Sequence, residues 1–297
     1  MFRFGFPLYF SAVLLSFLGQ FRSMVLAWFA SDFEIGNYMV ASNFLSLLSV
    51  LAVPISTALF PAFSKFDLNS EKGELGRFFR YSLRYVLLVI VPASMLVALV
   101  SRDLVYLVYG PQYSLAPFYL TLLVLTYLYM GFSLVVGSFF NGVGRTDVSF
   151  RVGLVNCFVG VPLGLLLTMF FGVLGLIVSM IMSGVVSLVY GLWVAVCRFG
   201  MVFDVKSVMK IYLAAFLSAI PVFVVVSCFS LFGCLVNLFL AVLVFVGVYL
   251  VLVPVVGAVK EEDINNLRSI FGKIRVLAPF VDVLLRFERK VLKLCCS

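Results

Sequence analysis

The chain has 297 residues, of which 64% are hydrophobic and only 11% are charged. Soluble domains are about 45–50% apolar and about 25% charged, so this composition leaves too little polar surface for a water-exposed exterior and excludes a soluble enzyme. The chain has no histidine and 13 acidic residues, so it lacks the commonest general base and the commonest zinc ligand. We therefore expect no enzymatic activity, no cofactor and no metal site.

Long uncharged segments predict membrane-spanning helices, because one crossing needs roughly 20 apolar residues. Runs such as residues 86–100 and 236–259 are apolar on every face, which is typical of helices and not of the alternating strands of a membrane barrel. The sequence predicts an all-α integral membrane protein with about eight transmembrane helices. In chain order, the expected spans cover residues 6–30, 36–60, 80–100, 114–140, 149–171, 174–197, 209–232 and 234–257.

Lysine and arginine concentrate in alternate loops, which indicates the orientation. Short cytoplasmic loops carry an excess of positive charge, so these loops are expected inside, and eight spans place both termini there as well. The net charge of +8 then reflects topology and does not indicate nucleic-acid binding. Without another targeting signal, the expected location is the plasma membrane of a prokaryote. The basic loop residues are Lys65, Lys72, Arg77, Arg80, Arg84, Arg145, Arg151, Arg198, Lys206 and Lys210.

The composition becomes polar after residue 258, and apolar residues recur at helical spacing over 264–274 and 280–294. This pattern predicts two amphipathic helices. The basic side of the second suggests that it lies on the anionic inner leaflet. The alternative is a plain cytoplasmic tail.

The main candidate for function inside the membrane is Arg22. It comes eight residues before Ala30, about 12 Å below the outer end of its helix and close to the middle of the bilayer. Ionisable groups at that depth are costly and are usually functional. The planar donors of a guanidinium suit phosphate or carboxylate, which predicts an anionic ligand with Gln20 beside it. The alternative is an arginine that reaches to the outer interface or binds neighbouring backbone.

Two asparagines are the other candidate polar groups. Asn43 lies in the second predicted span and Asn156 in the fifth, and each can line a cavity or bond between helices. No aspartate or glutamate occurs inside a predicted span. Proton- and sodium-coupled exporters of cationic drugs usually need such a buried carboxylate, so the sequence shows no site of that kind.

Four segments resemble, in this order, motifs in the second half of the polysaccharide flippases of the MOP superfamily. Residues 19–65 (GQFRSMVLAWFASDFEIGNYMVASNFLSLLSVLAVPISTALFPAFSK) are similar to the seventh and eighth spans of those proteins. Residues 108–125 (VYGPQYSLAPFYLTLLVL), 139–147 (FFNGVGRTD) and 170–180 (FFGVLGLIVSM) resemble later turns and a span.

The resemblance implies the C-terminal lobe of a MATE/MurJ-like flippase fold. It divides the chain into a six-helix lobe (1–200), two additional transmembrane helices (201–258) and a cytoplasmic amphipathic tail (259–297). The implied activity is translocation of a lipid-linked oligosaccharide or polysaccharide precursor by alternating access. Arg22 matches a stretch where the family often has a charged residue, whereas Gln20 replaces the usual acid. The expected substrate-binding residues are Arg22, Gln20, Asn43 and Asn156.

Family members have two lobes, and this chain resembles the second. We therefore expect a half-transporter that works with a separate N-lobe subunit or as a homodimer, with membrane lipid and an anionic lipid-linked glycan as its other partners. One alternative is a non-transporting remnant or a scaffold in glycan assembly. Another is a membrane-embedded enzyme, which is disfavoured because the sequence shows no acidic pair, metal cluster or nucleophile constellation.

Overall fold

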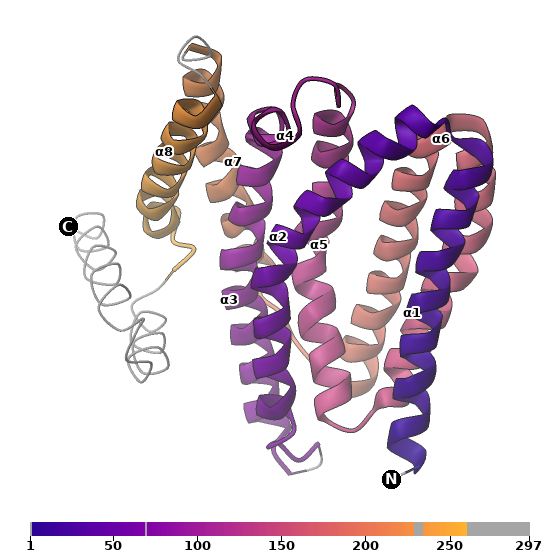
Figure 1. Ribbon diagram of the computed structural model, residues 1–297. Coiled ribbons are helices and arrows are strands. Elements are labelled where there is room, and N and C mark those ends of the chain that lie inside the picture. Colours follow the sequence, from indigo (N-terminus) through magenta and orange to yellow (C-terminus); the bar gives the residue numbers. More distant parts are fainter. Residues whose placement is uncertain (1, 69, 229–233, 260–297) are drawn as a thin grey trace. The chain divides into compact units, whose positions relative to one another are not determined.

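The computed structural model describes residues 2–68, 70–228 and 234–259, and the regular elements in these ranges are helices (Figure 1). Seven of them are long and apolar enough to cross a membrane. This confirms the predicted all-α, multi-pass membrane fold. The predicted amphipathic helices of residues 264–294 lie outside the described residues. The helices are α1 (Phe2–Phe29), α2 (Asp32–Phe63), α3 (Lys72–Leu99), α4 (Ser101–Tyr109), α5 (Ala116–Gly142), α6 (Thr146–Phe199), α7 (Val205–Cys228) and α8 (Cys234–Val255).

The 54-residue α6 contains two crossings joined at Gly172. The φ of 56° and ψ of −136° at Gly172 are not helical, and such a positive φ favours glycine. Residues equally distant from this turn face each other: Gly160 lies against Ser183, and Gly164 against Ser179. The two legs of α6 are therefore antiparallel and correspond to the predicted spans 149–171 and 174–197.

The described helices form two compact units, of which the first covers Met1–Phe203. In this unit α1 packs on α6, α2 and α3 pack on α5, and α5 packs on α6. Helices α1 and α2 diverge from their shared turn (Figure 1). Each of these two helices therefore has a different main partner, α6 for α1 and α5 for α2.

Buried aromatic rings hold together one end of the first unit. Phe63 of α2 lies 5.7 Å from Phe139 of α5, and Phe79 of α3 lies 5.4 Å from the same ring, centroid to centroid. Phe199 at the end of α6 stacks edge-on against Phe139 at 5.8 Å. The N-terminus and the connections α2–α3 and α5–α6 lie at this same end (Figure 1), which we call the basic end because both connections carry lysine or arginine.

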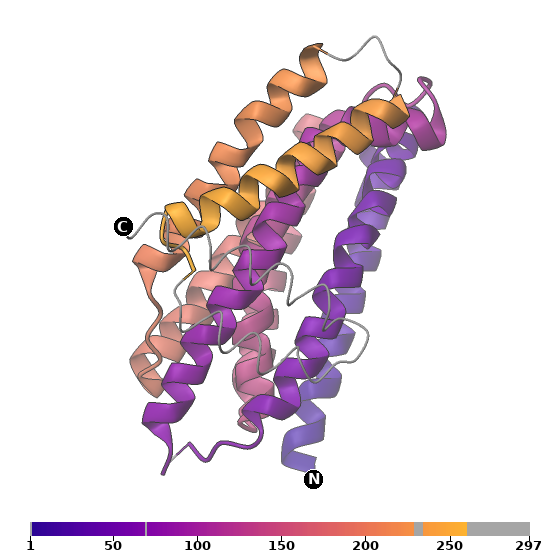
Figure 2. The ribbon, with the colours of Figure 1, turned by 90° about the vertical axis from the view of Figure 1, so that its left-hand side faces the viewer.

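The second unit begins at Asp204, and its described helices, α7 and α8, pack side by side (Figure 2). Asp204 caps α7: its Oδ1 accepts hydrogen bonds from the backbone N–H of Lys206 at 3.1 Å and of Ser207 at 3.3 Å. A carboxylate at a helix N-terminus is favourable because it also meets the positive end of the helix dipole.

The short helix α4 was not predicted. Residues 101–113 lie between two predicted spans, 80–100 and 114–140, and the charged pair Arg102 and Asp103 predicts a loop there. The structure shows a helix whose buried side, including Val105, packs on α5. Ser101 Oγ and Thr121 Oγ1 share a hydrogen bond of 3.1 Å across this contact.

Asn37 of α2 connects two helices and should be important for stability. Its Oδ1 accepts hydrogen bonds from the backbone N–H of Leu115 at 3.0 Å and of Ala116 at 2.9 Å, at the start of α5. An unsatisfied buried donor costs about 1–3 kcal/mol. We expect Asn37→Ala to lower the thermal unfolding midpoint of the protein in detergent clearly, whereas Asn43→Ala, at an exposed position, should change it little. Equal midpoints for the two variants would contradict this role.

Candidate functional site

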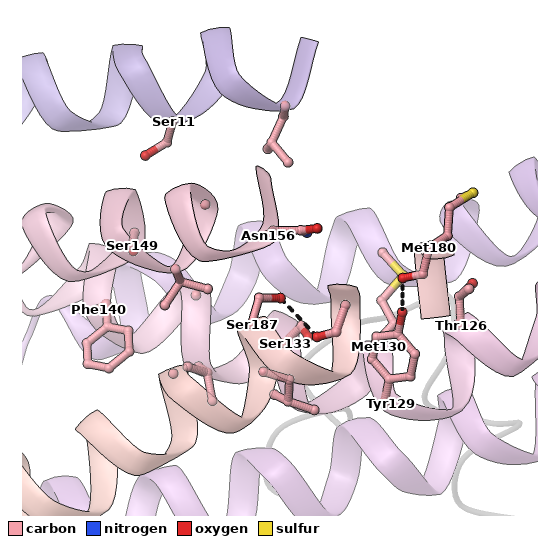
Figure 3. A pocket seen from close by; sticks show the side chains of 18 of the residues that line it. Ser11, Thr126, Tyr129, Met130, Ser133, Phe140, Ser149, Asn156, Met180 and Ser187 are labelled. Atoms are coloured by element: carbon pink, nitrogen blue, oxygen red, sulfur yellow. Dashed lines mark hydrogen bonds between the residues drawn. The ribbon is translucent and has the colours of Figure 1, made fainter. Parts of the chain in front are cut away.

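A cavity of about 610 Å³ lies within the first unit. Its walls come from α1, α5 and both legs of α6 (Figure 3), and α2 contributes Leu45. Polar side chains are common in these walls although every contributing helix is a candidate membrane span. A cavity with both polar and apolar lining residues, formed by helices that can span a membrane, suits a ligand that itself has polar and apolar parts. The polar side chains are Ser11, Arg22, Thr126, Tyr127, Tyr129, Ser133, Asn141, Ser149, Asn156 and Ser187.

The structure brings two of the four predicted site residues together. Arg22 and Asn156 both line the cavity. Gln20 is exposed and is not among the lining residues. Asn43 is also exposed, and its Nδ2 donates a hydrogen bond of 3.3 Å to Tyr109 Oη, away from the cavity walls.

Arg22 is the single charged residue among those that line the cavity. It lies on α1 and is partly buried. Tyr38, Tyr129 and Cys157 lie near enough to interact electrostatically with it, and none of the lining residues is an aspartate or glutamate. A cation in a low-dielectric site with no opposite charge attracts an anion strongly.

Two tyrosines near Arg22 were not predicted as site residues. Tyr129 Oη donates to the carbonyl oxygen of Met180 at 3.4 Å, and Tyr38 Oη donates to the sulfur of the same residue at 3.8 Å (Figure 3 shows the first). Both bonds are long, and sulfur is a weak acceptor. The hydroxyls can therefore turn to a better acceptor such as a phosphate oxygen. Gly184 makes room for Tyr129, since a side chain there would overlap the phenol.

The two asparagines that line the cavity, Asn141 and Asn156, differ in whether their side-chain oxygen accepts a hydrogen bond. The Oδ1 of Asn156 is buried and accepts no hydrogen bond from the described residues. Asn141, near the basic end, instead accepts a hydrogen bond of 2.8 Å from Ser149 Oγ. Ser149 and Asn156 are two helical turns apart on α6, so they lie on the same face of that helix.

Charged residues hold the α5–α6 turn at the basic end. Arg145 forms two hydrogen bonds with the carboxylate of Asp147, at 3.0 Å from Nε and 3.2 Å from an Nη atom. These bonds raise the pKa of Arg145, so it stays charged. Arg151 Nη lies 3.9 Å from the same carboxylate. Arg145 and Arg151 therefore stabilise the α5–α6 turn through Asp147. They do not line the cavity, whereas Arg22 does.

Sequence comparisons match the chain to one protein family and to two archaeal proteins. Residues 1–117 match a family described as "Polysaccharide biosynthesis protein". The chain is 21% identical over 258 residues to the uncharacterized membrane protein MJ1068 of Methanocaldococcus jannaschii, covering 86% of this chain and 50% of that protein. It is 18% identical over 165 residues to the probable low-salt glycan biosynthesis flippase Agl15 of Haloferax volcanii, covering 56% and 35%. The chain thus spans half or less of the length of these two relatives.

The fold agrees with these matches. The solved structure of the lipid II flippase MurJ in an inward closed conformation superposes with a TM-score of 0.69 at 16% identity, covering 83% of this chain and 52% of that one. The fold is therefore that of a multi-pass membrane protein whose helices are arranged as in about half of MurJ. Together with the family and sequence matches, it confirms the predicted resemblance to the polysaccharide flippases of the MOP superfamily.

Proposed function

We propose that this lobe carries a lipid-linked oligosaccharide or polysaccharide precursor across the membrane by alternating access, with Arg22 binding the phosphate of the substrate. The observation that supports it is a cavity formed by helices that can span a membrane, in which Arg22 is the one charged lining residue. No enzymatic step is needed for this activity, because flipping moves an intact lipid.

The cavity has the right size and chemistry for the head group of such a lipid. Its volume of about 610 Å³ falls in the usual range of ligand pockets, about 300–1,000 Å³. A guanidinium offers two parallel donors to a phosphate, and the hydroxyl of Tyr129, which also lines the cavity, can add a third. The polyprenyl or dolichyl chain would remain in the bilayer, where its burial needs no protein.

We further propose that a second lobe completes the transport pathway. In the spans of α1 and α2, 17% of the residues are buried, against 50% in α3. Large apolar side chains such as Phe17, Met24 and Trp28 are exposed on α1, on the helix that also carries Arg22. A second lobe from a separate subunit, from a second copy of the chain or from a longer polypeptide would cover this face. The basic end would face the cytoplasm of a prokaryotic cell.

The second lobe can be tested by measuring the native mass of the complex after gentle extraction from its own membrane, with identification of each copurifying chain. We expect a stoichiometric partner of about six spans, a homodimer, or a polypeptide that itself contains both lobes. A lone single lobe would contradict the proposal and would favour the non-transporting scaffold.

Transport itself can be tested on the complete complex reconstituted into vesicles. A lipid-linked oligosaccharide added to the inner leaflet should become accessible to an external glycosidase faster than in protein-free vesicles. Equal rates with and without protein would contradict flipping by this complex.

A further inference from the structure

The cavity continues from Arg22 toward the basic end along one side of α5. Its lining residues on this helix include Tyr129, Ser133, Gly137 and Asn141, which follow one another four positions apart and are therefore neighbours on the helix surface. Tyr129 lies near Arg22, whereas Asn141 lies one residue before the end of α5. At a rise of 1.5 Å per residue, the four residues extend over about 18 Å. We call them the α5 row.

Ser133 gives this row a hydroxyl that is free to bind a ligand. Serines within helices often donate to a carbonyl of their own helix, as Ser11 does to Pro7 at 2.8 Å and Ser187 does to Gly184 at 2.9 Å in the same cavity. Ser133 is exposed and forms no hydrogen bond with the described residues. Its hydroxyl can therefore both donate to a ligand in the cavity and accept from it.

Asn141 adds free donors at the other end of the row. Its Oδ1 accepts the hydrogen bond from Ser149 Oγ at 2.8 Å, whereas its Nδ2 donates to none of the described residues. This Nδ2 is not among the buried side-chain atoms that lack a partner, so it keeps surface that a ligand can reach. A Cβ atom on Gly137, between Ser133 and Asn141, would meet no atom within 4 Å. The row therefore borders open space between its two polar side chains.

The spacing of the α5 row suits a chain of sugars. One helical turn rises about 5.4 Å, which is close to the length that one pyranose ring adds to an extended oligosaccharide. A phosphate held by Arg22 and Tyr129 would place the first sugar beside Ser133, the second beside Gly137 and the third beside Asn141. Sugar hydroxyls both donate and accept hydrogen bonds, so they match the two polar side chains. A single sugar would not extend as far as Asn141.

We infer that the α5 row binds the first three sugars of the head group and that Asn141 selects carriers whose glycan has at least three sugars. This inference rests on the proposed function and adds to it the part of the glycan that the lobe recognises. The sugars extend from the phosphate toward the basic end, and the lobe prefers an extended glycan to a single sugar. The glycosyl transfers that add the second and third sugars must therefore precede translocation.

Two forms of one carrier test this inference on the complete complex in detergent. The first is the lipid-linked oligosaccharide extracted from the cells that make the protein, and the second is the same material trimmed to one sugar with exoglycosidases. Both forms have the same lipid and phosphate, so they differ only in the outer sugars. We expect the wild-type complex to bind the intact form about tenfold more tightly, as for one added hydrogen bond to a ligand. The measurement is the dissociation constant of each form by microscale thermophoresis.

Asn141→Ala should bind the intact form only as tightly as the trimmed form, and it should bind the trimmed form like the wild-type complex. Ser149 loses its acceptor in this variant, but its hydroxyl can turn to a carbonyl of its own helix. Gly137→Leu is the second variant. It fills open space in a helix, where leucine is more favourable than glycine, so it should fold and should remove the same preference by blocking the second sugar.

The matched control is Gly247→Leu on α8. A Cβ atom there also meets nothing within 4 Å, but Gly247 is not among the residues that line the cavity. This variant should keep the full preference for the intact form.

Equal binding of the two forms by the wild-type complex would overturn the inference, as would a preference that Asn141→Ala or Gly137→Leu retains. An equal loss of affinity for both forms in Asn141→Ala would also overturn it, because the amide would then act on the phosphate or the first sugar. An extracted carrier with fewer than three sugars would do the same. Failure of the proposed function looks different. In that case Arg22→Ala would bind the trimmed form as tightly as the wild-type complex, or the wild-type complex would bind neither form.

Discussion

Arg22→Ala is expected to abolish translocation of the lipid-linked glycan while protein level and membrane insertion stay normal. Arg22 is the one charged group among the lining residues of the cavity, so the variant leaves the phosphate of the substrate without a counter-charge inside the membrane. Removing one partner of a buried, hydrogen-bonded charge pair costs about 2–5 kcal/mol, which corresponds to a loss of about 30-fold or more. The measurement is the initial rate of flipping in reconstituted vesicles.

Two further variants separate the effect of charge from that of geometry. Arg22→Lys keeps the charge but loses the two-pronged geometry of the guanidinium, so it should retain part of the rate. Arg102→Ala removes an exposed arginine whose guanidinium lies 5.4 Å above the ring of Tyr106, outside the cavity, and should transport normally. Unchanged transport by Arg22→Ala would contradict phosphate binding and would favour the reading of Arg22 as a side chain that reaches to the outer interface.

Gly175→Ala is expected to prevent the two legs of α6 from closing, with a large loss of folded protein. Gly175 lies just after the turn at Gly172, and a Cβ atom there would overlap the backbone carbonyl of Leu167 on the facing leg. Overpacking usually costs about 1–3 kcal/mol and more when backbone must move. Backbone in a short hairpin has little freedom to move away. We expect a fall in the thermal unfolding midpoint in detergent and a smaller monodisperse fraction in size-exclusion chromatography.

The matched control for this variant is Gly153→Ala on the same helix. A Cβ atom on Gly153 would lie 3.7 Å from Leu14 Cδ1, an ordinary van der Waals distance, and alanine has the higher helix propensity. Its unfolding midpoint should equal or slightly exceed that of the wild-type protein. If Gly175→Ala were as stable as Gly153→Ala, the close approach of the two legs would be wrong.

The sequence by itself determined the class of protein and the candidate membrane spans of the part of the chain that the structure describes. Hydropathy is sufficient for this, because a span must be apolar along its whole length and each break between spans is polar or contains a turn residue. The sequence predicts a loop at residues 171–173, between the spans 149–171 and 174–197, and the structure reverses the chain there at Gly172. The order of motifs also identified the flippase resemblance, which the family match and the fold confirmed.

Only the tertiary structure decided which polar residues share a cavity. Helical spacing shows which residues of one helix share a face: Gln20 and Arg22 are two positions apart, about 200° around the helix, so they point to opposite sides. Spacing does not show which helix that face meets. Asn156 lies beside the cavity with Arg22 because α1 packs on α6, whereas Asn43 contacts Tyr109. Tyr129 of α5 lines the same cavity for the same reason, because α5 packs on α6. Contacts between residues more than one hundred positions apart depend on how whole helices pack. Because the spans are largely apolar on every side, the sequence does not show which face of a helix contacts which neighbour.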